Sequence, residues 1–173
     1  MPRVKKPLSA SLEDYLEVIY HLQKRDKAAR AKDIADRMKV QPASVTGALR
    51  ELSARGLINY QPYSLVTLTE EGLEVAKDII RRHEVLRKFF RTVLKLSPRQ
   101  SETNACRIEH AINPDAMARL VKFIEFLERC PRAGYEWFDS FEKFCNNGIN
   151  PDECRVCIEE CLRRVGDSEE EKE

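Results

Sequence analysis

Residues 106 to 110 read CRIEH, a short run that holds three kinds of metal-binding side chain. An α-helix advances by about 100° per residue, so Cys106, Glu109 and His110 fall on one face of a helix. Thiolate, carboxylate and imidazole are the groups that bind zinc and the first-row divalent metals. The alternative is structural: the thiol fills a small apolar space, the carboxylate pairs with an arginine, and the imidazole lies on the surface.

Further ligand types stand at helical spacing elsewhere in the chain. Asp14 and Glu17 are three residues apart on a first amphipathic segment, and His83 lies within a long one. His21 follows Glu17 by one turn, but a solvated helix face explains it better. Three helices therefore offer six candidate metal ligands: Asp14, Glu17, His83, Cys106, Glu109 and His110.

The first 72 residues predict the elements that a DNA-binding domain needs. Apolar side chains recur at helical spacing over residues 9–25, a short helix is expected over residues 31–38, and Pro42 opens another that Gly56 ends. Two short helices joined by a tight turn form a helix-turn-helix. The stretch LINYQPYSLVTLT then alternates around Pro62 and predicts a hairpin. Together these elements predict a winged helix-turn-helix.

The remainder of the chain predicts a mainly α-helical protein. A helix with a broad apolar stripe should run from Glu70 to about Leu94, a second starts at Ser97 and Pro98 and carries CRIEH, and a third spans residues 114–129. So wide a stripe needs further cover, which favours a dimerisation core. The pattern loosens after Cys130 until Asn150 and Pro151 cap a last helix. We expect a winged helix-turn-helix domain over 1–72, a helical metal-binding and dimerisation domain over 73–129, a Cys-rich segment over 130–165 and a disordered acidic tail over 166–173.

Composition narrows the class of protein. With 173 residues, 42% hydrophobic and 34% charged, the chain can bury a core, and its apolar runs are too short for a membrane span or a signal peptide. A cytoplasmic location is therefore expected. Lys and Arg exceed Asp and Glu before residue 65, whereas acidic residues prevail after it. This division favours an N-terminal module that meets a polyanion.

Five segments, in this order and spacing, resemble the diphtheria toxin repressor and manganese transport regulator family of metal-activated repressors. They are SLEDYLEVIY at 11–20, ASVTGALRELSARGLI at 43–58, LVTLTEEG at 65–72, RRHEVLRKFF at 81–90 and ACRIEHAI at 105–112. The resemblance covers roughly residues 8–129. It implies a homodimer that binds a double-stranded DNA operator when loaded with Fe(II) or Mn(II), and that represses genes of metal homeostasis.

The same resemblance implies that the six candidate residues are metal ligands. Asp14 and Glu17 look like the carboxylates of the manganese-responsive branch, whereas Cys106 looks like the thiol of the iron-responsive branch. A second site would resemble His83, Arg87 and Glu102, but Arg87 stands where a carboxylate is expected. Sulfur favours Fe(II), Co(II) or Zn(II), and an oxygen-rich shell favours Mn(II). Co(II), Ni(II) or Zn(II) could substitute for the activating metal.

The helix that follows the turn should read DNA. Polar and small side chains on it can reach base edges, and basic and hydroxyl groups around it can reach phosphates. Gly47 leaves the reading face without a side chain. The DNA-binding candidates are Lys32, Arg37, Lys39, Gln41, Pro42, Ala43, Ser44, Thr46, Arg50, Tyr63 and Ser64.

Five cysteines lie close to the C-terminus, at the spacing Cx14Cx8CxxCxxxC, outside the reach of the resemblance. They are Cys130, Cys145, Cys154, Cys157 and Cys161. On a last helix, three of the thiols converge, and four could bind structural Zn(II) or an iron–sulfur cluster. The alternative is that they fill a small apolar face as reduced cysteines.

Two other functions compete with a metal-activated repressor. Mixed Cys, His and Glu sites also support metalloenzymes, but the chain has neither a nucleophile motif nor a phosphate loop, so an enzyme is not expected. A winged-helix regulator could instead sense redox state through the C-terminal thiols or a cluster there. Comparing the metal dependence of DNA binding with its peroxide dependence distinguishes a redox sensor from a metal-activated repressor.

Overall fold

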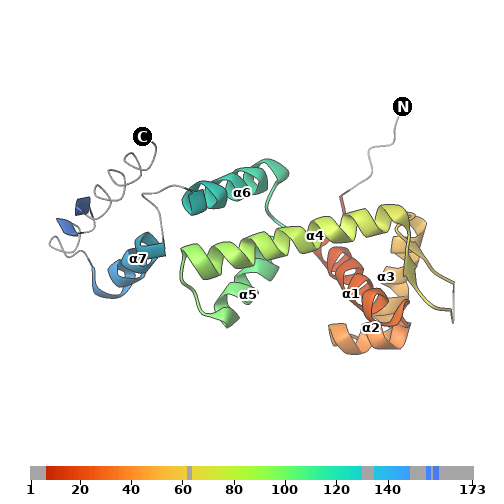
Figure 1. The fold of residues 1–173 in the computed structure, drawn as a ribbon. Coiled ribbons are helices and arrows are strands. Elements are labelled where there is room, and N and C mark those ends of the chain that lie inside the picture. Colours follow the sequence, from red (N-terminus) through yellow and green to blue (C-terminus); the bar gives the residue numbers. More distant parts are fainter. Residues whose placement is uncertain (1–6, 62–63, 130–134, 149–154, 157, 160–173) are drawn as a thin grey trace. The chain divides into compact units, whose positions relative to one another are not determined.

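The chain forms two compact units, Met1–His83 and Glu84–Glu173, which are described separately (Figure 1). The computed structural model describes residues 7–61, 64–129, 135–148, 155–156 and 158–159. The expected last helix after Asn150 falls mostly outside these ranges, and the acidic tail over 166–173 lies wholly outside them. None of the helices within the described ranges is long and apolar enough to cross a bilayer.

The first three helices lie where the sequence predicts them. Helix α1 spans Ala10–Asp26 and begins at Ser9, whose hydroxyl accepts a hydrogen bond from the Leu12 backbone N–H. Helix α2 spans Ala31–Met38, and α3 spans Pro42–Ala54 with its proline in the first turn. Lys39 adopts a left-handed conformation, with φ of 57°, and turns the chain between α2 and α3. The helix-turn-helix is thus confirmed.

The wing is a small antiparallel hairpin. Strand β1, Ile58–Asn59, pairs with β2, Thr67–Leu68, with Ile58 opposite Leu68. Ala29 joins this sheet by an isolated bridge in which it exchanges two backbone hydrogen bonds with Val66. These bonds hold the start of α2 beside the returning strand of the wing. The side chain of Gln23 accepts a further bond from the Leu68 N–H, which ties α1 to β2.

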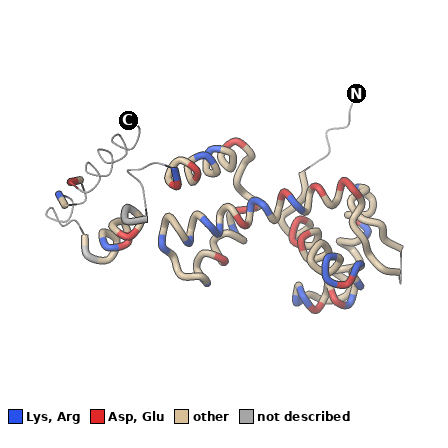
Figure 2. Tube along the Cα trace, viewed as in Figure 1, with Lys and Arg blue, Asp and Glu red and all other residues tan. Residues whose placement is uncertain are grey.

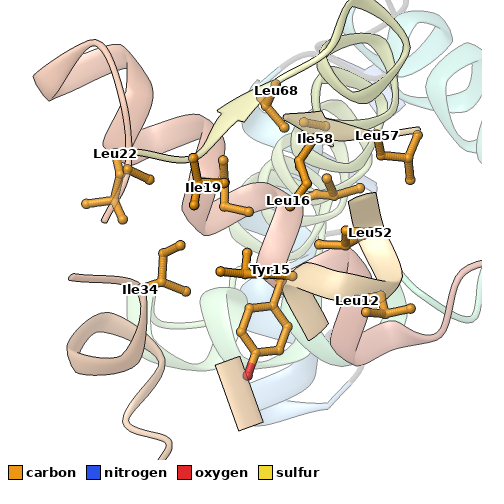
Figure 3. Packing of buried hydrophobic residues seen from close by; sticks show 14 of the residues in the cluster. Leu12, Tyr15, Leu16, Ile19, Leu22, Ile34, Leu52, Leu57, Ile58 and Leu68 are labelled. Carbon is orange, nitrogen blue, oxygen red and sulfur yellow. The ribbon is translucent and has the colours of Figure 1, made fainter. Parts of the chain in front are cut away.

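One apolar core holds the first unit together (Figure 3). Leu16 and Ile19 of α1 are fully buried in it, and Ile34 of α2 and Leu52 of α3 pack on the same cluster. These positions recur every three or four residues along each helix, so burying them fixes which helix faces remain exposed. The core therefore determines the orientation of α3, and with it the surface that can meet DNA.

Helix α4, Glu70–Lys88, packs its first turn tightly against the wing. The Thr69 hydroxyl caps this turn by accepting from the Gly72 N–H, and it donates to the Gly56 carbonyl. A Cβ atom added at Gly72 would overlap the Leu57 carbonyl group. The sequence predicts one helix to about Leu94, but the α-helical part ends at Lys88 and Phe89–Val93 forms a π-helical segment, η1. There Phe90 and Val93 are buried in two different clusters.

The second unit is wholly helical within the described residues. It contains α5, Pro98–Ile108, which a Ser97–Gln100 capping box begins, and α6, Pro114–Arg129. The sequence pattern loosens after Cys130, yet the structure has a helix there, α7, Tyr135–Asn147. Phe138 of α7 packs with Val93 and Leu127, and this tertiary contact accounts for a helix that the apolar pattern alone does not indicate.

Candidate functional site

Helix α3 presents a polar face to solvent. Val45, Leu49 and Leu52 bury one side of it, so the residues at other phases of the helix point outwards. Ser44, Gly47 and Arg50, at spacings of three, are exposed. A helix with a buried apolar stripe and an exposed small or polar stripe is the geometry that a recognition helix requires. The predicted reading face is therefore available.

The other described DNA-binding candidates are exposed, except Thr46. Thr46 is half-buried, and its hydroxyl donates to the Pro42 carbonyl at 3.2 Å, so in this arrangement it is partly committed to the helix. Ser64 is exposed and is held by the wing turn, since its hydroxyl donates to the Gln61 carbonyl at 2.7 Å. Tyr63 lies outside the described residues. The remaining candidates are all exposed: Lys32, Arg37, Lys39, Gln41, Pro42 and Ala43.

Helix α5 carries a first pair of potential metal donors in the second unit. A carboxylate oxygen of Glu102 and the Cys106 Sγ lie within 4.8 Å of one another, and both side chains are exposed. The two residues are four apart, so they stand one above the other on the helix surface. A thiolate and a carboxylate at this separation can bind one cation.

Glu109 and His110 form a second pair just beyond the end of α5. The helix ends at Ile108, and the turn that follows brings the His110 Nε2 to 3.3 Å from Glu109 Oε1. Glu109 is only 1% exposed, one of two buried polar residues in the described part of the chain. The CRIEH donors are thus distributed over two pairs.

The candidate ligands of the first unit lie on α1 and near the end of α4. Asp14 and Glu17 are three residues apart on α1, and Glu17 Oε1 lies 3.6 Å from the Nε2 of His21, whose side chain is 41% exposed. One residue before Asp14, Glu13 pairs with Arg82 at 3.3 Å, and both side chains are only 15% exposed. Because His83 follows Arg82, this pair fixes α1 to α4 directly beside two candidate ligands.

The donor chemistry fits a divalent cation. Each unit supplies carboxylate oxygens and an imidazole, and the second adds a thiol, which are the groups that Mn(II), Fe(II) and Zn(II) accept. Glu109 and His110 place a carboxylate oxygen 3.3 Å from an imidazole nitrogen, and a divalent cation can accept both donor types.

The C-terminal cysteines are mostly beyond the described residues. Cys145 lies on α7 and is exposed. Cys130, Cys154, Cys157 and Cys161 fall outside the described ranges, so the structure offers no test of a zinc or cluster site there.

Figure 2 shows Lys and Arg interspersed with Asp and Glu along α4, where Lys77 pairs with Glu74 and Arg81 with Asp78. Exposed pairs of this kind contribute little to stability.

Two family models match this chain in tandem. Residues 7–66 match the N-terminal DNA-binding domain of iron-dependent repressors, and residues 69–138 match their metal-binding and dimerisation domain. The matched ranges agree with the winged helix-turn-helix and with the helices that follow it.

Curated relatives and solved structures agree with these models. The chain is 34% identical over 119 residues to an uncharacterised helix-turn-helix transcriptional regulator of Methanocaldococcus jannaschii, covering 68% of this chain and 95% of that protein. It is 31% identical over 121 residues to the regulator MntR of Lysinibacillus sphaericus, covering 70% and 86%.

Among solved structures, a manganese-dependent transcriptional repressor in complex with manganese matches with a TM-score of 0.61 and 30% identity, over 70% of this chain. The manganese regulator SloR matches with a TM-score of 0.60 and 28% identity. The chain spans 56% of the length of each of these solved proteins. None of the relatives named here is described as a redox sensor. The chain therefore belongs to the iron-dependent repressor family, a family of metal-dependent transcriptional repressors and not of enzymes.

Proposed function

We propose that this protein is a homodimeric repressor that binds its operator when Fe(II) or Mn(II) occupies sites completed by donors from both units. The observation that carries the proposal is the buried Glu109 carboxylate 3.3 Å from the His110 imidazole at the end of α5. A carboxylate and an imidazole preassembled within the protein lower the cost of ordering a metal site. As a repressor it acts where its operator lies, which places it in the cytoplasm.

We assign the ligands to two sets. Within the second unit, Glu109 and His110 form one pair and Glu102 and Cys106 form another, and we propose that Asp14 adds a ligand to the first pair and His83 to the second. Glu17, three residues from Asp14 on α1, adds a carboxylate to the first set. The sequence predicted one cluster of six ligands. This assignment divides them into two sets and adds Glu102 as the partner of Cys106. Arg87 contributes no ligand to the second set.

Each set combines donors from α1 or α4 with donors on α5 or in the turn that follows it. The bound cation supplies the positive charge that both groups of donors share. Asp14 and Glu17 thereby restrain α1, and α1 packs directly on the core that orients α3. In a twofold dimer, the two recognition helices must be about 34 Å apart to enter successive major grooves. Restraining α1 raises the fraction of dimers at that separation, and the apparent DNA affinity rises with that fraction.

The choice of metal follows from the two sets. Asp14, Glu17, Glu109 and His110 make a shell rich in oxygen, which suits Mn(II). The thiol of Cys106 makes the second set better suited to Fe(II), with Co(II), Ni(II) or Zn(II) as substitutes. Relatives named as manganese regulators support Mn(II) as one physiological candidate. The cysteines at 130, 145, 154, 157 and 161 remain a proposed site for zinc or an iron–sulfur cluster.

An anaerobic gel-shift titration with Fe(II) and Mn(II) tests the proposal. We expect wild-type protein to retain duplex DNA selected with it only when metal is present, and His110→Ala and Cys106→Ala to lose that dependence while remaining dimers. The matched control is His21→Ala, which removes an imidazole from an exposed position. An undiminished metal response in both His110→Ala and Cys106→Ala would refute the ligand assignment. Wild-type binding that ignores metal altogether would refute the function.

A further inference from the structure

A hollow of about 580 Å³ lies in the first unit between the recognition helix, the start of α2 and the wing. Its lining is basic and hydroxylic, with a small apolar part, and contains no carboxylate: Arg30, Ala31, Thr46, Arg50, Tyr60, Ser64 and Leu65. A volume of this size falls in the range of small-ligand sites and exceeds that of a single inorganic anion.

Two arginines line this hollow. Within the described part of the chain, neither the Arg30 nor the Arg50 guanidinium makes a hydrogen bond or an ion pair, and both side chains are exposed. Two like charges that line one hollow repel each other, and an anion placed between them would relieve that repulsion. Guanidinium groups also have the planar geometry that binds phosphate oxygens in pairs.

The fold holds the parts of the hollow in place. Ala29, directly before Arg30, exchanges backbone hydrogen bonds of 2.9 and 2.8 Å with Val66, directly after Leu65. On the wing, the Ser64 hydroxyl is fixed between the Gln61 N–H and the Gln61 carbonyl. Arg30 thus stands opposite the wing because of a bridge between residues 37 apart in the sequence, and this explains why sequence patterns did not indicate it.

We infer that this hollow, which we call the Arg30 pocket, binds one sugar–phosphate unit of the operator backbone, with Arg30 and Arg50 on the phosphate and Ala31 and Leu65 against the deoxyribose. Leu65 is 55% exposed, an unusual position for a leucine unless a partner covers it. The inference rests on the proposed function. It adds Arg30 to the DNA-binding residues. It also assigns Arg50 to a phosphate, whereas the sequence suggested that Arg50 contacts a base edge.

The test uses full-length, metal-loaded protein and a duplex selected with the wild type. Arg30→Ala should weaken binding roughly tenfold, equally for the selected duplex and for random DNA, and should reduce the slope of log K against log salt by about 1. Arg30→Lys should keep the salt slope and recover part of the affinity, since it retains the charge but not the planar fork. The control Arg25→Ala removes an arginine paired with Asp26 outside the pocket and should change neither quantity.

A neutral methylphosphonate, placed at one backbone position at a time, identifies the phosphate. At one position in each half-site, the substitution should weaken the wild type and Arg25→Ala but have no further effect on Arg30→Ala. Unchanged affinity and salt slope in Arg30→Ala would overturn the inference, as would a loss confined to the selected duplex, which indicates base reading. Failure of the wild type itself to bind DNA with metal would instead refute the proposed function, so the two failures are distinguishable.

Discussion

Replacing Gly47 with alanine should stabilise the DNA-binding unit and yet impair DNA binding. Gly47 lies within α3, is exposed, and a Cβ atom built on it has no protein atom within 4 Å. Alanine therefore meets no clash in the protein, and it favours a helix over glycine by about 1 kcal/mol. The equilibrium constant for unfolding should fall roughly fivefold.

The effect on DNA binding should have the opposite sign. Gly47 lies between Ser44 and Arg50 on the exposed face of α3, so a new methyl group there would stand between the helix and a base edge. We expect affinity for the selected duplex to fall by about tenfold or more, as overpacking a close interface costs about 1–3 kcal/mol. Urea unfolding followed by circular dichroism and a gel shift on the same preparation measure both effects.

Gly72→Ala provides the contrast for this experiment. A Cβ atom at Gly72 would overlap the Leu57 backbone, so this substitution should destabilise the unit by several kcal/mol. Stabilisation by Gly47→Ala together with unchanged DNA affinity would refute the assignment of this face of α3 to DNA. Destabilisation by Gly47→Ala would refute the packing argument instead.

Three further predictions concern the metal ligands and their supports. Glu13→Gln should weaken Mn(II) binding several-fold, measured by calorimetry, because the Glu13–Arg82 pair fixes α1 to α4 beside Asp14 and His83; an unchanged affinity contradicts this. Bound Fe(II) or Co(II) should slow alkylation of exposed Cys106, measured by peptide mass spectrometry, and an unchanged alkylation rate would argue against a metal–thiolate bond. Burial raises the pKa of the Tyr15 hydroxyl, so the unfolded state loses this proton at a lower pH than the folded state does. The free energy of unfolding should therefore fall as pH rises above about 10. Tyr15→Phe should flatten this alkaline loss in urea titrations, and an identical loss in the variant would exclude Tyr15 as its cause.

Sequence periodicity was sufficient for the elements whose apolar positions pack within the first unit. Leu12, Leu16 and Ile19 on α1, and Val45 and Leu49 on α3, are buried as their spacing predicts. Helix α7 was not indicated, because Phe138 is the one buried side chain among those described in α7 and it packs with residues far away in the chain. The π-helical end of α4 likewise follows from packing and not from a local signal.

The sequence indicated which residues could bind a metal but not how the donors at residues 102–110 pair with one another. A helix continuing through His110 would place Cys106, Glu109 and His110 on one face, whereas α5 ends at Ile108. Cys106 therefore pairs with Glu102 one turn before it, and Glu109 meets its neighbour His110 in the turn. The position of Arg30 could not be predicted from local sequence either, because it depends on the bridge between Ala29 and Val66, which are far apart in the sequence.

Anomalous diffraction from crystals grown with Mn(II) tests the central claim most directly. The account predicts a peak bound directly by Glu109 and His110 and by Asp14 of the same protomer. A peak bound only by residues of one unit, or no peak near Glu109 while the metal-loaded protein still binds its operator, would contradict it.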